Sequence, residues 1–508
     1  MMVIHKHKQP FLRLCSLFFV LSLFFTPASV VLANDDDGAN TIFLPLVTSG
    51  ATEVAVNQDV QAASVEPSKD MVQMLIPLYI FPLSAPDTLK PAWNDVIAAN
   101  AKIPVTAIIN PNSGPVKANH QNFAPYLYAM QQLKNAGVRM LGYVPTKTRW
   151  LNGQEVTLSI LDVYNLIDRW HNLYRDDNGQ PLIDGIFLDQ APSAYDIYDF
   201  DHYENFAGHV RALSADYQVV LNPGVSPNEV YINYPLVETY FPSTQTTVQP
   251  RTSRLADTTV IFENLSPYWP GYVPPTYVTD GTYDTIYAPP QQIYGAHRFS
   301  MMIHAVPDAA TMRTYLDLAR ARNIGYVYVT DDATYTTDGN PWDTLPSYWQ
   351  AEVDYIQQLN TLSFQASDIP TAFIRHQFFR AKLTSIFSDL DKKDATFKLV
   401  PGLANNGDPM RVSFESVNYP GYYLRVTATD NTVMLRVKQN DAQYLADATF
   451  RLRPGLNNAS LTSFEAVSRP GAYLHHANGL VWVDPTNNSA SFNPSATFNL
   501  TAPWWTTP

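Results

Sequence analysis

Two carboxylates that follow apolar runs are the residues in this chain best suited to chemistry. Asp189 ends the run IDGIFLD, and Glu263 ends the run TTVIFE. Hydrolysis of a glycosidic bond needs an acid that protonates the leaving oxygen and a second carboxylate that acts as base or nucleophile. Partial burial behind an apolar strand raises a carboxyl pKa towards the range that such an acid needs. We therefore expect Asp189 and Glu263 to form a catalytic pair. The alternative is that each carboxylate caps the following helix or pairs with Arg298.

Eight apolar runs between Leu75 and Thr330 predict the fold that positions these carboxylates. Each run is nearly continuous, stops on a polar residue and is separated from the next by a segment of helical length. This is the pattern of parallel strands that are buried on both faces. We predict an α/β fold, a (β/α)8 TIM-like barrel, in which the chemistry lies at the C-terminal strand ends. The runs are MLIPLYIFP, PVTAIINPNSGP, VRMLGYVPT, IDGIFLDQ, QVVLNPG, TTVIFEN, SMMIHA and IGYVYVTDD.

Further polar and aromatic side chains at these strand ends suit sugar binding. Asparagine amides supply a donor and an acceptor for vicinal hydroxyls, and aromatic rings stack on the apolar faces of sugars. Packing at the barrel rim explains any one aromatic residue equally well, and a histidine here is alternatively a core residue bonded to the backbone. The expected substrate-binding residues are Tyr79, Asn110, Tyr143, Gln190, Asn222 and His304, with Tyr268 and Trp269 as further stacking candidates.

The composition argues against several other classes of protein. The net charge is −13 and no basic stripe is present, which does not fit a nucleic-acid binder. Charged residues make up only 16% and aromatic residues 13%, a profile that fits an extracellular protein with aromatic surfaces. His, Asp and Glu show no metal-ligand spacing and no Gly-rich phosphate loop is present, so we expect no metal and no cofactor.

The N-terminus predicts export. Basic residues precede an apolar stretch that ends in small residues at Ala33, the pattern of a signal peptide over residues 1–33. We expect a secreted, extracellular protein without membrane attachment after cleavage, and an uncleaved membrane anchor is the alternative. Cleavage would remove Cys15, the only cysteine, so the mature chain would have no disulfide. Residues 34–70 are acidic, small and aperiodic, which indicates a linker.

Residues 71–360, the predicted barrel domain, resemble the spherulin-4 family, glycoside hydrolase family 135. The motifs that carry the resemblance are PLYIFP, IINPNSGP, LGYVPT, DGIFLD, LNPG, FEN and NPW. The resemblance implies a (β/α)8 fold and endo-acting hydrolysis of a polysaccharide of α-1,4-linked galactosamine and N-acetylgalactosamine.

The family pattern has an Asp-Glu pair after the fourth strand and a Glu after the sixth, and this chain departs from it at one position. Asp189 and Glu263 match two of the three acids, but Gln190 replaces the third. A carboxamide cannot transfer the catalytic proton. The alternatives are therefore a non-catalytic glycan-binding protein, a hydrolase with another substrate, or recruitment of a nearby acid such as Asp196.

An internal repeat predicts a second, all-β domain over residues 368–503. The segments FIRH, YLRV and YLHH recur at intervals of 50 residues, and each is followed by DATF, DATF or SATF. Three copies of a β-rich unit near 50 residues long point to a β-trefoil with pseudo-threefold symmetry. The phrases SFESVNYPGYYLR and DATFRLRPGL resemble the AbfB domain of arabinofuranosidases, carbohydrate-binding module family 42.

The AbfB resemblance implies arabinose-type sugar binding by a His after YLR and the Asp of DATF. The first lobe keeps both, as His376 and Asp394. The second keeps Asp447 but has Val426 in place of the His, and the third keeps His476 but has Ser495 in place of the Asp. We expect at most one good site, in lobe one, with weak binding in lobe three. The alternatives are a scaffold trefoil without ligand, or a barrel that hydrolyses an arabinose-bearing polymer.

Overall fold

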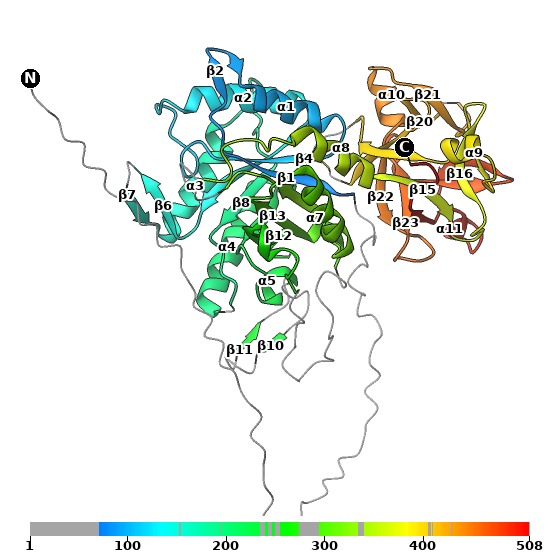
Figure 1. Cartoon of the computed structure of the whole chain (residues 1–508). Helices are drawn as coiled ribbons and strands as arrows, with labels where there is room; N and C mark the ends of the chain where they lie inside the picture. The colour runs from blue at the N-terminus through cyan, green and yellow to red at the C-terminus, as the bar shows by residue number, and fades with distance from the viewer. Residues whose placement is uncertain are drawn as a thin grey trace, which may run out of the picture. The chain divides into compact units, whose positions relative to one another are not determined.

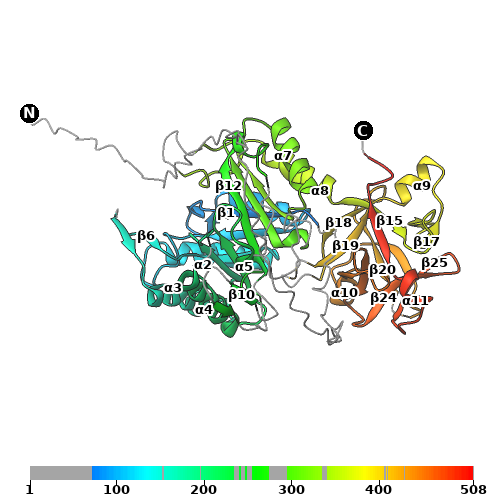
Figure 2. The same cartoon turned by 90° about the horizontal axis from the view of Figure 1, so that it is seen from below.

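The computed structural model describes residues 71–506 apart from 152–153, 195, 234–238, 242–245, 249–253, 274–293, 334–339, 405–407, 409 and 428. The signal peptide expected at 1–33 and the linker expected at 34–70 lie outside the described residues. The described part of the chain forms a parallel barrel that is followed by an antiparallel β domain (Figures 1 and 2).

The eight apolar runs form the predicted barrel. Its strands close in the order β1-β14-β13-β12-β9-β8-β5-β4, and every pairing between them is parallel. The strands are β1 (Gln73–Leu78), β4 (Val105–Ile109), β5 (Arg139–Pro145), β8 (Gly185–Asp189), β9 (Gln218–Asn222), β12 (Thr258–Leu265), β13 (Phe299–His304) and β14 (Tyr326–Val329). Most of their side chains are fully buried, because helices cover the outside of the barrel and side chains fill the inside.

The connecting segments supply the helices that the barrel needs. Asp308 caps helix α7 (Ala309–Ala321), because its carboxylate accepts a hydrogen bond from the Thr311 backbone N–H at 2.8 Å. Helices α3 and α4 lie side by side on the barrel surface (Figures 1 and 2). The helices are α1 (Pro91–Asn100), α2 (Phe123–Asn135), α3 (Ile160–Leu173), α4 (Ile197–Leu213), α5 (Glu229–Asn233), α7 (Ala309–Ala321) and α8 (Trp349–Leu359), with the 3-10 turns η1 (Ser266–Tyr268) and η2 (Ala296–Arg298).

Short antiparallel hairpins lie in the loops of the barrel. They are β2 (Leu83–Ala85) with β3 (Thr88–Leu89), β6 (Thr148–Leu151) with β7 (Gln154–Thr157), and β10 (Thr239–Phe241) with β11 (Thr246–Val248). The β6–β7 hairpin directly follows β5 and projects outward from the C-terminal end of the barrel strands (Figure 1).

The second domain is the predicted trefoil, built from three copies of a four-strand unit. Phe364, Phe414 and Phe464 occupy the same position in each copy, and their ring centroids lie 5.0–5.4 Å apart. This triangle is the packing that a pseudo-threefold axis requires. The units are β15 (Thr361–Ala366), β16 (Phe373–Gln377), β17 (Arg380–Thr384), α9 (Asp389–Asp394) and β18 (Phe397–Pro401); β19 (Arg411–Ser416), β20 (Tyr422–Val426), β21 (Val433–Val437), α10 (Ala442–Asp447) and β22 (Phe450–Pro454); β23 (Thr462–Ala466), β24 (Ala472–Ala477), β25 (Leu480–Pro485), α11 (Phe492–Ser495) and β26 (Phe498–Thr501).

The trefoil begins before residue 368, the start predicted from the sequence. Strand β15 pairs with the last strand, β26, from Ser363 with Thr501 to Ala366 with Phe498. This pairing closes the repeat on itself, so the first copy includes the segment SFQASD that corresponds to SFESVN in the second copy.

Candidate active site

Four neighbouring barrel strands bring the predicted catalytic residues together. Tyr143, Asp189, Asn222 and Glu263 lie on β5, β8, β9 and β12, which are adjacent in the barrel. Asp189 is in register with Asn222 on the next strand. Because parallel strands end at the same edge, the four side chains converge at the barrel mouth.

The amide of Asn222 links the two carboxylates. Its Nδ2 donates to Asp189 Oδ1 at 2.8 Å and to Glu263 Oε2 at 2.6 Å. These two oxygens therefore lie at most about 5.4 Å apart, the sum of the two distances. The Asn222 Oδ1 in turn accepts a hydrogen bond from the Gly224 backbone N–H at 3.0 Å, which fixes the orientation of the amide. The two carboxyl groups are thus held by one donor.

The two carboxylates differ in how strongly their charged forms are stabilised. Burial, followed by the negative charge of Asp189, raises the pKa of Glu263 to about 7. Burial also raises the pKa of Asp189, but three donors oppose this effect: the Tyr143 hydroxyl, the Gln190 backbone N–H and the Asn222 amide. Near neutral pH Glu263 is therefore poised to hold a proton, while three donors stabilise the anion of Asp189.

Two tyrosines line the site beside Asp189. The Tyr143 hydroxyl donates to Asp189 Oδ2 at 2.6 Å, and the Tyr79 ring packs edge-on against the Tyr143 ring at 5.6 Å. Burial, followed by the nearby carboxylates, raises the pKa of both hydroxyls well above the ordinary value, so both stay protonated. A Cβ at Gly142 would lie 2.6 Å from the Trp170 ring, so this glycine lets Trp170 pack on β5 and bond the Tyr143 carbonyl.

Trp342 is a site residue that the ends of the predicted strands do not identify. Its indole N–H donates to the Glu263 carboxylate, and its ring packs edge-on against His304 at 5.7 Å. It follows β14 in a loop, within the motif NPW, which is the signal in the sequence that could have identified it. His304 is buried, and burial lowers its pKa to about 4, so this imidazole is neutral at the mouth.

The other barrel residues named from the sequence have different surroundings in the structure. Asn110 Oδ1 accepts the Gly114 N–H at 2.8 Å and so shapes its own loop. Tyr268 is exposed, whereas Trp269 is fully buried and packs against Arg322. Arg298 donates to the backbone carbonyls of Ala256 and Asp257, which precede β12, at the opposite end of the strand from Glu263.

Gln190 turns away from the carboxylate pair. Its backbone has a φ of 65°, the left-handed region that a residue with a side chain seldom adopts. Its Oε1 accepts hydrogen bonds from the backbone N–H groups of Lys147 at 3.0 Å and Thr148 at 2.9 Å. The amide that replaces the expected third acid is therefore bonded to the β6–β7 hairpin.

In the first two lobes of the trefoil, the Asp of DATF is bonded to an arginine. Arg375 donates to Asp394 Oδ2 at 3.2 Å in lobe one, and Arg425 donates to Asp447 Oδ2 at 3.0 Å in lobe two. Asp394 also accepts from the Asn418 amide at 2.8 Å. These pairs are largely buried, so the aspartates have a structural role whether or not they also bind a sugar.

The histidines of lobes one and three have different partners. His376 Nε2 lies 3.0 Å from Asn418 Oδ1 and 3.4 Å from Asp394 Oδ1. His476 Nε2 lies 2.8 Å from Asp368 Oδ1, and Asp368 corresponds in the repeat to Asn418, the partner of His376. Lobe three thus keeps a His–carboxylate pair although Ser495 replaces its DATF aspartate. Sugar binding by these four residues stays a prediction.

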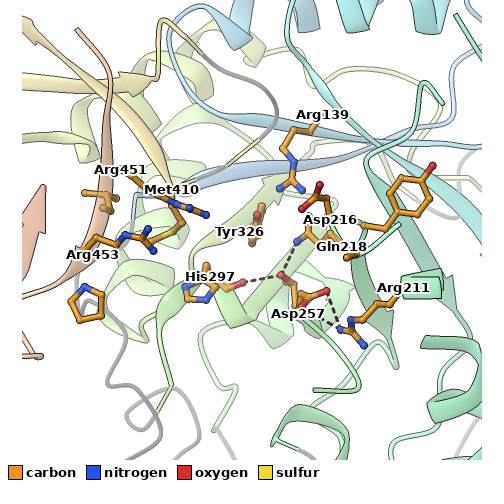
Figure 3. A pocket seen from close by; sticks show the side chains of 15 residues that line it. Arg139, Arg211, Asp216, Gln218, Asp257, His297, Tyr326, Met410, Arg451 and Arg453 are labelled. Carbon is orange, nitrogen blue, oxygen red and sulfur yellow. Dashed lines mark hydrogen bonds and ion pairs between the residues drawn. The ribbon is translucent and has the colours of Figure 1, made fainter. Parts of the chain in front are cut away.

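A separate cavity of about 390 Å³ lies at the other end of the barrel strands, and Figure 3 shows it. Arg139, Gln218 and Asp257, at the starts of β5, β9 and β12, are among the residues that line it, and Asp257 forms an ion pair with Arg211. None of the predicted catalytic residues lines this cavity. Among the described residues, no group of three or more His, Cys, Asp or Glu side chains could hold a metal ion. None of the described helices is long and apolar enough to cross a membrane.

The fold and site define a class: a sugar-acting protein with a glycoside hydrolase-type barrel and a carbohydrate-binding-type trefoil. The family then follows from the sequence. Residues 73–356 match the Spherulation-specific family 4 (Spherulin4), and the chain belongs to this family. Residues 362–500 match the alpha-L-arabinofuranosidase B (AbfB) domain.

Some individual relatives match the barrel and others match the trefoil. Spherulin-4 of Physarum polycephalum is 27% identical over 298 residues, which cover 58% of this chain and 72% of that protein. Alpha-L-arabinofuranosidase B of Aspergillus niger is 34% identical over 90 residues, 17% of this chain and 18% of that enzyme, so only a small part of the arabinofuranosidase is shared. Aspergillus clavatus Sph3, in a crystal structure with GalNAc, is 21% identical and covers 57% of this chain and 99% of its own, with a TM-score of 0.40.

Proposed function

We propose that this protein is a secreted glycoside hydrolase that cleaves α-1,4-linked polysaccharide containing galactosamine or N-acetylgalactosamine from within the chain. The observation that carries the proposal is the Asp189–Asn222–Glu263 arrangement, in which one amide holds two carboxyl groups at the mouth of the barrel. Membership of the spherulin-4 family supports the same chemistry, and the motifs shared with family 135 suggest the substrate.

In this proposal Glu263 is the general acid and Asp189 the nucleophile. Glu263 has the higher tendency to hold a proton at neutral pH, whereas three donors stabilise the Asp189 anion. Glu263 protonates the leaving oxygen while Asp189 bonds to the anomeric carbon, and water then releases the sugar with Glu263 acting as base. The spacing of at most about 5.4 Å between the two oxygens that Asn222 bonds fits the roughly 5–5.5 Å of retaining enzymes better than the wider gap of inverting enzymes.

The first experiment compares product release by the wild type, Asp189→Asn and Glu263→Gln. Each is incubated with α-1,4-galactosaminoglycan in acetylated and deacetylated form, and oligosaccharides are separated by mass. We expect products from the wild type and at least a thousandfold less from both variants. Equal release by all three proteins would overturn the assignment of the pair, and release only from an arabinose-bearing polymer would overturn the substrate.

A second candidate function is glycan binding without turnover. The observation that favours it is Gln190, a carboxamide at a position where the family pattern has an acid. On this alternative the wild type binds the polymer but releases nothing, and Gln190→Glu gains turnover. The hydrogen bonds of Gln190 to the β6–β7 hairpin argue for the hydrolase instead, because they point this side chain away from the carboxylate pair.

The trefoil is proposed to target the enzyme to polysaccharide, with arabinose-type sugars as candidate ligands. Its match to the AbfB domain supports this role. Affinity of the full chain for arabinan, measured for the wild type and for His376→Ala and His476→Ala, tests it. No affinity in the wild type would favour a scaffold trefoil.

A further inference from the structure

The side chain next to Asp189 anchors a hairpin at the barrel mouth. Besides accepting two backbone N–H groups at the start of the hairpin, the Gln190 amide donates from Nε2 to Thr148 Oγ1 at 3.3 Å. Three hydrogen bonds thus join Lys147 and Thr148, at the start of the hairpin, to the residue that follows the proposed nucleophile. The strained backbone of Gln190 is the kind of feature that persists where surrounding structure fixes it at a functional site.

The two faces of this hairpin have different surroundings. Side chains alternate along a strand, so Thr148 and Trp150 share one face and Arg149 lies on the other. Thr148 contacts Gln190, so its face is the one directed towards the residue that follows Asp189. Arg149 is buried on the opposite face, where it donates to the Asn112 carbonyl at 3.2 Å. Trp150 therefore lies on the face that contacts Gln190, roughly 7 Å beyond Thr148 along the strand.

Trp150 keeps a large exposed surface in this position. Its side chain is 37% exposed, and its cross-strand neighbour is Glu155, which is also exposed. The exposed part of an indole can stack on the apolar face of a pyranose ring.

We propose that Trp150 is a sugar-stacking residue of the barrel and that Gln190 is the positioning residue that holds it there. The ligand is a pyranose unit of the same polysaccharide chain, one that lies outside the bond being cleaved. This proposal rests on the proposed function, because it takes the polysaccharide of the Asp189–Glu263 site as its ligand. It gives Gln190 a role that needs a hydrogen-bonding side chain but no proton transfer.

The test measures binding separately from turnover. The full chain carrying Glu263→Gln serves as the parent, so that bound sugars are not cleaved. Its Kd for partly acetylated α-1,4-galactosamine oligosaccharides of increasing length is measured by calorimetry. Trp150→Ala should raise the Kd of the longer oligosaccharides about fivefold or more and leave that of the shortest bound one unchanged, whereas Trp150→Phe should keep most of the affinity.

Val156 provides the matched control. It lies on the same hairpin, pairs with Arg149 and is 39% exposed, but it belongs to the opposite face. Val156→Ala should leave every Kd unchanged. An equal rise for Val156→Ala and Trp150→Ala would mean that the hairpin as a whole was disturbed, and no rise for Trp150→Ala would remove the stacking role; either result overturns the proposal.

Gln190 variants test the anchor. A glutamate can accept the same two backbone hydrogen bonds, so Gln190→Glu should keep the parent affinity. Gln190→Ala should raise the Kd of long oligosaccharides as Trp150→Ala does, and the double variant should add nothing further. Additive effects, or affinity lost in Gln190→Glu, contradict the positioning role. If the parent binds none of these sugars, the proposed function itself fails, and the hairpin proposal fails with it.

Discussion

Asp189 and Glu263 share a single donor, the Nδ2 of Asn222, at 2.8 and 2.6 Å. One amide group supplies a hydrogen to each carboxylate, so neither can move without disturbing the other. This relationship couples two acids that lie on strands separated by β9. It also makes their protonation interdependent, because the charge of Asp189 raises the pKa of Glu263.

Tyr143→Phe should weaken catalysis through Asp189. The change removes a 2.6 Å hydrogen bond to the carboxylate, an interaction worth about 1.5–3 kcal/mol when the acceptor is charged. We expect kcat to fall about ten- to a hundredfold and the acidic limb of the pH profile to move to higher pH, since the Asp189 anion loses a donor. Steady-state kinetics across pH check both effects. An unchanged acidic limb would show that Asp189 does not act as the anion.

Activity should decline as pH rises through about 7. The general acid must hold its proton, and burial beside Asp189 raises the pKa of Glu263 to about 7. The descending limb of kcat/KM should therefore lie near this value and should not move in Tyr143→Phe by as much as the acidic limb does. Full activity at pH 9 would contradict the role of Glu263.

The barrel should lose stability over the same pH range. In the native state Glu263 keeps its proton up to about pH 7, whereas in the unfolded chain it releases it near the ordinary value of 4.5. The native state thus binds more protons between these values, so stability is fully present below pH 4.5 and falls as pH rises to about 7, by at most about 3 kcal/mol. Urea unfolding at pH 4.5 and 8 should show this loss in the wild type and a smaller one in Glu263→Gln. Equal losses of stability in the two proteins would mean that a group other than Glu263 holds the buried proton.

Asp394→Ala should destabilise the trefoil. The substitution leaves the buried guanidinium of Arg375 without one of its carboxylate partners, and breaking such a pair costs about 3–5 kcal/mol. Ser495→Ala, at the matching position of lobe three, should cost about 1 kcal/mol or less, because among the described residues that serine bonds only its own helix carbonyl at Phe492. Measuring the free energy of unfolding of both variants tests this prediction. If both variants change the free energy of unfolding by a similar small amount, and only Asp394→Ala loses affinity for arabinan, Asp394 binds the sugar and does not stabilise the fold.

The sequence predicts the barrel and the convergence of its acids because both follow from strand periodicity. Buried parallel strands have a fixed direction, so Asp189, Asn222 and Glu263 at their ends must share one edge. The trefoil is equally predictable, since repeats of 50 residues place Phe364, Phe414 and Phe464 on one axis.

Residues set by loops and by chain closure are not predictable in this way. Trp342 reaches Glu263 from a loop, whose path depends on packing and not on a period. Gln190 points to the hairpin because of a left-handed backbone that favours no particular residue except glycine. Asp368 pairs with His476 only because β15 and β26 close the trefoil, which brings together residues 108 positions apart.

The most direct test of the central claim is the anomeric form of the first product. Proton NMR spectra are recorded during the first minutes of hydrolysis of α-1,4-galactosaminoglycan by the wild type, before mutarotation. A close carboxyl pair with Asp189 as nucleophile predicts that the α-anomer appears first, and that neither anomer forms with Asp189→Asn. The β-anomer first, or product formation that survives in Asp189→Asn, would contradict the account.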